Sequence, residues 1–559
     1  MSASGTPTHA WNVASHLRER ARIAPHSPAL FIPRRGTTAV DAFDVTTFDE
    51  LDAECERLAR GLRAIGVERG ERVALMVPPS LELFALTFAL LRLGAILVLV
   101  DPGLGIRSLT QCLGEAAPRT FIGIGRAHVA RRLFGWARAS VERTIHVGSR
   151  AWGGVSLDQL RRLGDRETAG GFAEVAKEDP AAILFTSGST GPPKGAAYTH
   201  GIFAHQVEWI RDAYAIEPGE IDLPTFPLFA LFDPALGMAA VIPRMDFTRP
   251  GRVDPRQIVG PIQSFGVTNM FGSPAVVRRV GLHLEATRTK LPTLRRVISA
   301  GAPASPPDLA RFRAALTEPD GDDGADLHTP YGATEALPLT TVRGREVLAH
   351  VEATRRGAGI CVGRPLPGVT LEVIEIDDAP IEQWTSARRC GPGTIGEIVA
   401  DGEVVTQQYH QRPEATRAAK IRDGDRVRHR LGDVGYFDDE GRLWFCGRKT
   451  HRVETSAGTL FTIACEGIFN AHPRVRRTAL VGVGSAPDAT PVLCVELEAD
   501  VRRSERRSIV DELVSLGRSH EMTRSIETFL IHPRFPVDIR HNSKIFRERL
   551  SVWAAKRLR

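Results

Sequence analysis

The chain has 559 residues, a formal net charge of +6, 43% apolar residues and 25% charged residues. One hydrophobic core does not grow to that length, so we expect at least two domains of ordinary globular composition. The seven cysteines form no CxxC pair or His/Cys cluster, which argues against a disulfide framework or a structural zinc site. The basic residues are interspersed among 66 acidic ones, a pattern that favours a solvated surface over a nucleic-acid or anionic-membrane partner.

No targeting or membrane segment is evident in the sequence. The first twenty residues lack a basic region followed by an apolar one, so no secretory signal is expected. The longest apolar stretch, Phe84–Val100, is interrupted by Arg92 and is too short for a membrane span. We therefore expect a reduced, cytoplasmic location.

Helical and strand-like segments alternate through the first two thirds of the chain. Residues 48–67 carry apolar side chains at helical spacing with a glycine near the end. Short apolar runs closed by Gly, Pro or Ser follow, among them RTFIGIG, RTIHVG, AAILFTSGS, IDLPTFP, VTNMFGSP and LRRVISAGAP. This alternation predicts a large α/β domain with buried, mostly parallel strands and covering helices.

The pattern changes after about Pro365. LEVIEI, GEIVADGEVV and the predicted hairpin FDDEGRLWF indicate an antiparallel or barrel-like subdomain. Beyond Arg448, a helix, two strands, a helix, a strand and a final helix predict a small α+β domain. We expect an N-terminal domain over residues 1–446 and a smaller, mobile C-terminal domain over residues 447–559.

The segment TSGSTGPPKG, residues 186–195, has the composition of a phosphate-binding loop. It is not a Walker loop, because Pro192 and Pro193 have no N–H to offer a phosphate and Gly195 replaces the magnesium-binding hydroxyl. It can still wrap a triphosphate through hydroxyls, backbone amides and one lysine. The residues expected to do so are Thr186, Ser187, Gly188, Ser189, Thr190, Gly191 and Lys194.

This loop resembles the phosphate-loop signature of the adenylate-forming superfamily, which includes acyl-CoA synthetases, peptide-synthetase adenylation domains and firefly luciferase. Four further motifs, SAGAP, YGATE, LGD with GR, and NSKI, follow in the family's order. The resemblance implies ATP and Mg²⁺ as cofactors, with the adenine, ribose and α-phosphate read by these motifs. It assigns cofactor binding to Gly301, Ala302, Pro303, Tyr331, Gly332, Asp433 and Arg448, and catalysis to Thr334, Glu335 and Lys544.

The implied roles agree with the chemistry of each residue type. Attack of a carboxylate on the α-phosphorus of ATP brings two anions together, so the transition state needs positive charge. In the family, a lysine at the position that Lys544 matches supplies this positive charge. Only seven of the 72 basic residues in this chain are lysines, so a lysine at this position is notable. Glu335 would hold Mg²⁺, which prefers oxygen ligands, and Asp433 would accept hydrogen bonds from the ribose hydroxyls.

The segment after Arg448 departs from the pattern of thioester-forming members. Placing it on the family pattern puts Thr450 at the hinge and Ala457 at the glycine that opens a path for pantetheine, with Arg452 in an apolar position. A one-residue shift would return Gly458 to that path. The sequence thus gives no standard CoA-ligating loop.

The acyl side is expected to be apolar. Residues 225–243 occupy the place of the segment that closes over the acyl group, and residues 267–277 add another apolar wall. No charged residue there is suited to an amino acid's ammonium group, and Asp233, before a proline, is interpreted as a helix N-cap. An aliphatic acid is therefore favoured. The predicted substrate contacts are Phe229, Leu231, Phe232 and Met270.

An adenylating enzyme without a thioester loop needs another nucleophile, and a hydroxyl on the substrate can serve. LFALFDPALG and PVDIRHNSKIF resemble the β-lactone-forming members of bacterial long-chain olefin biosynthesis. That resemblance implies adenylation of a 2-alkyl-3-hydroxy long-chain fatty acid, closure to a β-lactone, and association with other enzymes of the hydrocarbon pathway. His205 is one candidate for the general base, although a structural histidine is favoured there.

Two alternatives remain at this point. One is a long-chain acyl-CoA or acyl-carrier-protein ligase, which shares the first half-reaction and captures the acyl group with a thiol. The other is a nucleotide-binding regulatory or scaffold protein without turnover. Lys544, Glu335 and Asp433 are all present, which argues against loss of activity.

Overall fold

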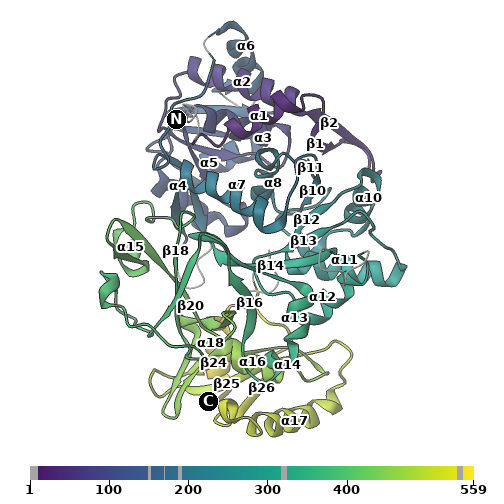
Figure 1. Ribbon diagram of the computed structural model, residues 1–559, viewed down its shortest axis with the longest axis vertical. Coiled ribbons are helices and arrows are strands. Elements are labelled where there is room, and N and C mark those ends of the chain that lie inside the picture. Colours follow the sequence, from purple (N-terminus) through teal and green to yellow (C-terminus); the bar gives the residue numbers. More distant parts are fainter. Residues whose placement is uncertain are drawn as a thin grey trace, which may run out of the picture.

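We analysed a computed structural model that describes residues 11–148, 153–168, 170–186, 192–316, 324–537 and 545–558. Figure 1 shows a large α/β body above a smaller group of C-terminal elements, with the chain running from the top of the view to the bottom. Two large sheets form the body, and two small sheets, one of two strands and one of three, lie in the C-terminal group. The α/β class predicted from the alternation of elements is confirmed.

The first sheet is mostly parallel, with the order β7-β6-β5-β3-β4-β8-β9. Only its last pair, β8 with β9, is antiparallel within the described residues. Its strands are β3 (Arg72–Met76), β4 (Ile96–Leu99), β5 (Thr120–Ile124), β6 (Arg143–Val147), β7 (Val155–Ser156), β8 (Pro180–Thr186) and β9 (Lys194–Thr199). Its helices are α2 (Phe48–Ala64), α3 (Leu81–Arg92), α4 (Ile106–Ala116), α5 (Gly125–Phe134), α6 (Leu157–Arg166) and α7 (His200–Tyr214).

The second sheet changes from parallel to antiparallel along its length. From β2 it runs β2-β1-β11-β10-β12-β13-β14-β15-β16-β21-β20-β18-β17, with β19 beside β20. Its strands are β1 (Pro28–Pro33), β2 (Phe43–Thr47), β10 (Ile221–Pro224), β11 (Ala239–Val241), β12 (Asn269–Gly272), β13 (Arg296–Ser299), β14 (Asp326–Ala333), β15 (Ala336–Arg343), β16 (Ile360–Pro365), β17 (Thr370–Ile374), β18 (Gly396–Asp401), β19 (Lys420–Asp423), β20 (Arg426–Phe437) and β21 (Leu443–Arg448).

The antiparallel part therefore continues the main sheet, and the hairpin expected from FDDEGRLWF is the β20–β21 pair. The helices of this half are α1 (Ser15–Ile23), α8 (Pro227–Ala230), α9 (Asp233–Leu236), α10 (Arg256–Phe265), α11 (Pro274–Thr287), α12 (Pro306–Arg313), α13 (Gly344–Ala349), α14 (Val351–Arg355) and α15 (Pro413–Ala419). Short 3₁₀ turns lie at Pro102–Leu104, Pro250–Arg252, Trp384–Ser386, Lys449–His451, Arg503–Glu505 and Glu521–Thr523.

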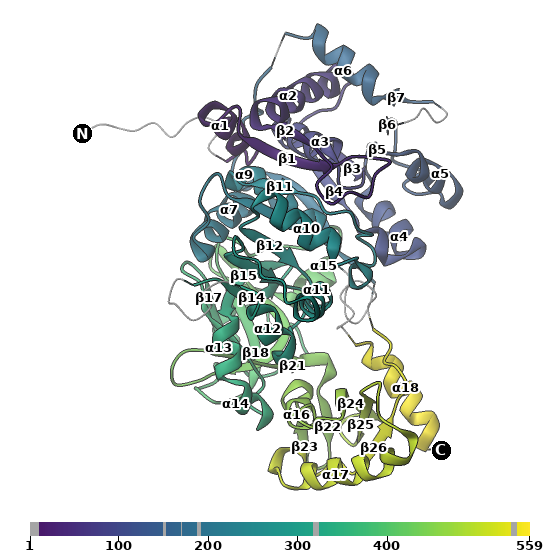
Figure 2. The same cartoon turned by 90° about the vertical axis from the view of Figure 1, so that its right-hand side faces the viewer.

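The C-terminal elements lie at the bottom of Figure 2, and from α16 onward they follow the predicted order, whereas the β22–β23 hairpin before α16 was not predicted. They are β22 (Val453–Thr455), β23 (Gly458–Leu460), α16 (Thr462–Phe469), β24 (Val475–Val483), β25 (Thr490–Leu497), α17 (Arg506–Arg518), β26 (Thr528–Ile531) and α18 (Arg547–Leu558). The chain leaves the large sheet after Arg448. The domain division between residues 446 and 447, which falls within β21, stays a prediction.

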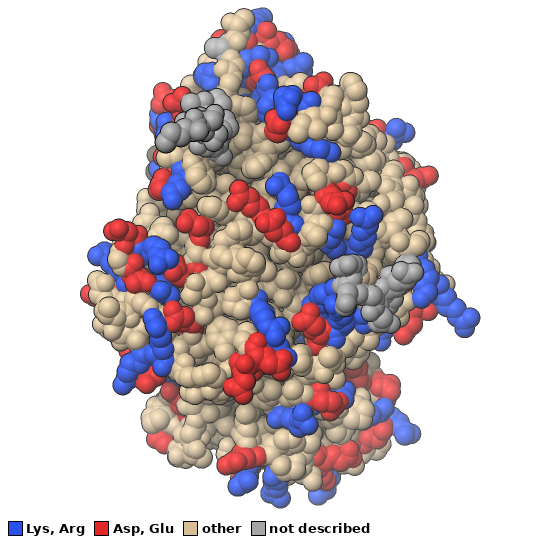
Figure 3. All heavy atoms as spheres, in the orientation of Figure 1, with Lys and Arg blue, Asp and Glu red and all other residues tan. Residues whose placement is uncertain are grey.

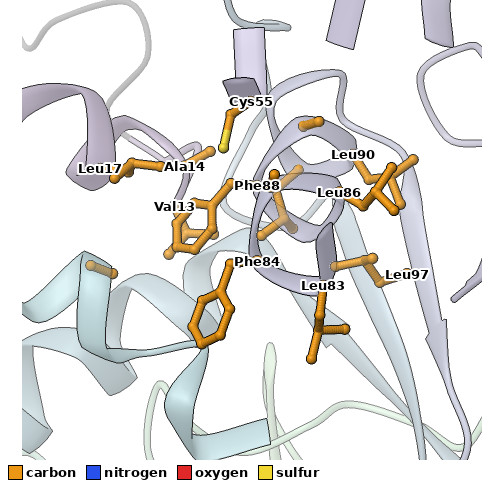
Figure 4. Packing of buried hydrophobic residues seen from close by; sticks show 14 of the residues in the cluster. Val13, Ala14, Leu17, Cys55, Leu83, Phe84, Leu86, Phe88, Leu90 and Leu97 are labelled. Carbon is orange, nitrogen blue, oxygen red and sulfur yellow. The ribbon is translucent and has the colours of Figure 1, made fainter. Parts of the chain in front are cut away.

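The apolar stretch that begins at Phe84 forms core, with α3 buried on all sides. In Figure 4, Phe84 and Phe88 lie on the side of α3 that faces Val13, whereas Leu86 and Leu90 lie on the opposite side. Neighbouring α2 begins with a capping box in which Thr47 and Glu50 bond each other's backbone N–H. No helix within the described ranges is long and apolar enough to cross a membrane.

Charge on the surface is mixed, as the composition predicted. On the face drawn in Figure 3, basic and acidic side chains are interspersed over both the large body and the C-terminal group. All seven cysteines are free, and six of them are buried.

Candidate active site

A cavity of about 790 Å³ lies between the two large sheets and reaches the start of the C-terminal elements. One end is lined by polar residues of β14, β20 and β21, and the other by aromatic and aliphatic residues of α7, α8, α9 and β12. The sequence motifs far apart in the chain therefore meet in one place. The two ends are described in turn.

Asp433, which is buried, forms a connected group with the partly exposed Tyr331 and Arg448 at the polar end. Tyr331 donates its phenolic hydrogen to Asp433 Oδ2 at 2.8 Å, and Arg448 Nη1 lies 3.1 Å from Asp433 Oδ1. Cross-strand pairing of β20 with β21 places Asp433 directly opposite Arg448. Burial raises the pKa of Asp433, and the guanidinium of Arg448 opposes that rise.

Asp433 Oδ1 makes no hydrogen bond of good geometry within the part of the chain that the structure describes. A buried carboxylate oxygen without such a bond is costly unless a ligand supplies the donor. A pair of sugar hydroxyls has that chemistry, so the residues present fit a nucleotide.

Glu335 lies beside this group at the end of the β14–β15 turn and lines the cavity. Tyr409 Oη donates to Glu335 Oε1 at 2.6 Å, and the Glu335 carbonyl accepts from Thr406 N at 2.9 Å and from Thr406 Oγ1 at 3.0 Å. The described residues contain no group of three metal-ligating side chains. A single fixed carboxylate fits Mg²⁺, which keeps water and phosphate oxygens as its other ligands.

Lys420 was missed by sequence reasoning. Its ammonium group is buried behind Glu335 and donates to the carbonyl of Thr406 and, at 3.1 Å, to Thr406 Oγ1. Burial lowers the pKa of Lys420 to about 7. The scarcity of lysine in this arginine-rich chain was the signal that could have drawn attention to Lys420, because arginine is the usual cation elsewhere in the sequence.

The predicted cofactor residues fall into three groups. Gly301, Tyr331, Gly332, Thr334, Lys194 and Arg448 line the cavity, whereas Ala302, Pro303 and Asp433 are not among the described lining residues. Thr186 ends β8, where it pairs with Lys194. Ser187, Gly188, Ser189, Thr190, Gly191 and Lys544 lie outside the described residues.

The apolar end is built mainly from aromatic rings. Phe229 stacks on Phe271 with ring centroids 3.9 Å apart, and Phe226 lies 5.6 Å from Phe229. On the other side of the short helices, Phe203 and Phe232 meet edge to face at 6.0 Å. These residues and Leu231 line the cavity, so the structure places three of the four predicted substrate contacts there.

Met270 was wrongly predicted to contact the substrate. Its side chain is fully buried and packs in a core cluster with Leu223 and Val276, away from the cavity. Successive side chains of a strand point to opposite faces. On β12 the cavity face therefore belongs to Phe271, the next residue.

Asp233 was wrongly interpreted as an N-cap. It is the first residue of α9, its side chain caps no N–H, and it shares a hydrogen bond with the carboxyl group of Asp222 on β10. Burial raises the pKa of Asp222 to about 7 and raises that of Asp233 well above its usual range, with each carboxyl affecting the other. The pair lies behind the aromatic wall.

The remaining expectations concern the linker and a base. Thr450 lines the cavity, whereas Ala457 lies in the exposed turn of the β22–β23 hairpin and the exposed Gly458 begins β23. His205 is not among the lining residues and instead lies near Glu208, Glu403 and the ring of Trp11. This position agrees with the interpretation of His205 as a structural histidine and not a general base.

One continuous cavity thus joins a group of polar residues that fits a nucleotide to a wall of apolar side chains. This arrangement is the one expected of an enzyme that joins a nucleotide to an apolar substrate. The chain belongs to the AMP-binding enzyme family, whose model matches residues 17–410.

Two curated relatives span almost the whole chain. One, from Xanthomonas campestris pv. campestris, is 48% identical over 100% of both chains, and another, from Stenotrophomonas maltophilia, is 49% identical over 98% of both. Each is named olefin beta-lactone synthetase. Among solved structures, the amide bond synthetase McbA from Marinactinospora thermotolerans has a TM-score of 0.78 at 22% identity, covering 97% of this chain and 99% of that one. That likeness shows the fold.

Proposed function

We propose that the protein adenylates a 2-alkyl-3-hydroxy long-chain fatty acid and closes the product to a β-lactone. The observation that carries this proposal is full-length identity of 48–49% to two relatives named for that reaction. The apolar end of the cavity supports an alkyl substrate, because its aromatic rings offer a large surface for burial. The lactone would serve bacterial olefin biosynthesis, alongside other enzymes of the hydrocarbon pathway.

ATP would lie at the polar end of the cavity. Tyr331 would pack beside the adenine, and Asp433 with Arg448 would hold the ribose, using Oδ1, which faces the Arg448 guanidinium. Thr334 would contact the α-phosphate, and Glu335 would hold Mg²⁺, which bridges the phosphates and disperses their charge. The loop over residues 186–194 would hold the β- and γ-phosphates, with Lys544 at the reacting carboxylate.

The proposed reaction has two bond exchanges. A carboxylate oxygen of the acid bonds to the α-phosphorus, and the bond to the β-phosphate oxygen breaks to release pyrophosphate. The substrate's hydroxyl oxygen then bonds to the acyl carbon, the bond from that carbon to the AMP oxygen breaks, and the hydroxyl proton passes to the departing phosphate. Holding both groups on one molecule favours the second step over attack by water.

A long-chain acyl-CoA or acyl-carrier-protein ligase is the second candidate function. It shares the first bond exchange, and a long-chain-fatty-acid–CoA ligase from Thermus thermophilus is 27% identical over 78% of this chain. The exposed, non-glycine position at Ala457 disfavours it, as does the much higher identity to the lactone-forming relatives. A nucleotide-binding scaffold without turnover is disfavoured by the presence of Lys544, Glu335 and Asp433.

One incubation separates these functions. The protein is mixed with ATP, Mg²⁺ and a racemic 2-alkyl-3-hydroxy long-chain acid, with and without CoA, and AMP and lactone are quantified. We expect AMP and β-lactone in equal amounts without CoA. A requirement for CoA would establish the ligase instead, and absence of AMP under both conditions would leave a binding protein.

A further inference from the structure

Gln206 is a polar residue in the wall of the cavity that none of the motifs contains. It lies in the second turn of α7 and is 1% exposed. Its neighbour His205 points elsewhere, since only Gln206 of the two lines the cavity. A buried carboxamide beside aromatic rings is costly unless its polar atoms are paired.

The hydrogen bonds of Gln206 fix the orientation of its carboxamide. Nε2 donates to the carbonyl oxygen of Leu337 at 2.9 Å. A carbonyl only accepts, so the nitrogen must face Leu337 and the oxygen must face away from it. Oε1 is shielded from water and makes no hydrogen bond within the described residues. Gln206, a residue of the cavity wall, therefore carries a buried acceptor that no described group satisfies.

The position of this acceptor is set by the segment that carries Thr334 and Glu335. Leu337 closes that segment, and Tyr198, just before α7, donates its phenolic hydrogen to the Thr334 carbonyl at 2.5 Å. Leu337, Thr334 and Tyr198 all line the cavity. Gln206 is thus tied to the place where the acid would meet the α-phosphate, on the side that leads to the apolar end.

Two other buried oxygens of the cavity wall lack partners among the described residues, the hydroxyls of Thr87 and Ser273. A hydroxyl rotates, and it both donates and accepts. Neither hydroxyl is tied by a described hydrogen bond to the Thr334–Leu337 segment. Gln206 Oε1 differs because it only accepts and because its bonded partner holds it in place.

We propose that Gln206 is a specificity-determining residue whose Oε1 accepts a hydrogen bond from the substrate's 3-hydroxyl group. This inference rests on the proposed function. Oε1 would reach the hydroxyl by a rotation of the carboxamide that keeps Nε2 on the Leu337 carbonyl. The hydroxyl, on the carbon second from the carboxyl group, is then held beside the acyl carbon that it attacks. An amide is not a base, so Gln206 positions the hydroxyl and another group takes the proton.

The test compares two acids, a 2-alkyl-3-hydroxy long-chain acid and the matched 2-alkyl acid without the hydroxyl. The kcat/KM for acid-dependent ATP–pyrophosphate exchange is measured for each, and their ratio is the discrimination for the hydroxyl. In Gln206→Met, which keeps the side-chain length and removes the acceptor, we expect kcat/KM for the hydroxy acid to fall about tenfold. The value for the matched acid should change little, so that the ratio falls by the same factor.

Two further variants separate recognition from damage to the fold. In Gln206→Glu the buried carboxyl is expected to be protonated, so it can donate to Leu337 and still accept from substrate, and the wild-type ratio should persist. Thr87→Val removes a different unpaired oxygen from the same cavity and should leave the ratio unchanged. Equal losses with both acids in Gln206→Met, or an unchanged ratio, would overturn the proposal.

The failure of the proposed function gives a different result. If wild-type protein forms adenylate from both acids but no lactone from the hydroxy acid, lactone formation is refuted while the ratio still decides the role of Gln206. If the wild-type ratio is already one, Gln206 does not recognise the hydroxyl. If the wild type exchanges pyrophosphate with neither acid, both proposals fail.

Discussion

The two ends of the cavity are built in different ways. The polar end uses single side chains from β14, β20 and β21, each held by a specific hydrogen bond or ion pair, such as Tyr331 to Asp433 and Tyr409 to Glu335. The apolar end uses stacked and tilted rings, such as Phe229 on Phe271, that are continuous with the core. A substitution at the polar end should therefore lower the reaction rate by removing one functional group. A substitution at the apolar end should alter both the KM for the acid and the free energy of unfolding.

The largest effect is expected from Lys544→Ala, at the lysine proposed to act on the reacting carboxylate. Loss of the proposed charge at the reacting carboxylate should lower the rate of AMP formation by about 100- to 1,000-fold. The measurement is single-turnover AMP release at saturating ATP and acid. Lys556→Ala removes an exposed lysine from α18 and is the matched control, with an unchanged rate. Unchanged AMP formation in Lys544→Ala would refute its role and weaken the contrast between the two ends.

Met270 on β12 and Phe229 on α8 together give the sharpest test of the apolar end. Met270→Ala should destabilise the fold by about 2–5 kcal/mol because it leaves a hole in the core, while the preference among acid chain lengths persists. Phe229→Ala should instead raise KM for the longest acids about tenfold and leave KM for ATP unchanged. Urea unfolding and chain-length series provide the two measurements. A changed chain-length preference in Met270→Ala would contradict its assignment to the core.

A smaller effect is expected behind the apolar wall, at the carboxyl pair Asp222 and Asp233. Both pKa values are raised, to about 7 for Asp222, so the folded chain holds protons that the unfolded chain releases near its ordinary value of 3.8. This contribution is fully present below pH 4 and is lost as pH rises through about 7. Asp233→Asn replaces one carboxyl of the pair by a neutral amide, so the decrease in stability at high pH should disappear. The variant should be more stable than the wild type at pH 8 by about 1–2 kcal/mol.

The check is urea unfolding at pH 5 and pH 8. The advantage of Asp233→Asn should shrink at the lower pH, where the wild-type pair is closer to fully protonated. Asp439→Asn, at an exposed turn position, should show no pH-dependent difference from the wild type. A stability difference that is constant between the two pH values would exclude the shared proton.

The residues proposed for the polar end stand out in the sequence for a physical reason. Binding a nucleotide needs particular functional groups at fixed spacing, so Tyr331, Glu335, Asp433 and Arg448 stand out as motifs. Their convergence follows from the order of strands in the second sheet. The helices and strands were predictable as well, because their apolar periodicities differ.

The misplaced residues depend on contacts that a linear pattern does not contain. Met270 and Phe271 are both apolar, so the sequence does not say which of them faces the core. Asp233 precedes a proline as N-caps do, but its partner Asp222 comes from another element. Gln206 and Lys420 acquire their significance only from the carbonyls of Leu337 and Thr406 that receive their hydrogen bonds.

The strands beneath both ends of the cavity belong to one hydrogen-bonded sheet that runs from β10 and β12 through β14 to β21. Cross-strand spacing within such a sheet is nearly constant, about 5 Å per strand. The separation between Asp433 with Arg448 on one side and Phe271 on the other is therefore set by the backbone. Under the proposed function, the alkyl chain of an acid would be measured outward from its carboxyl group against this constant spacing.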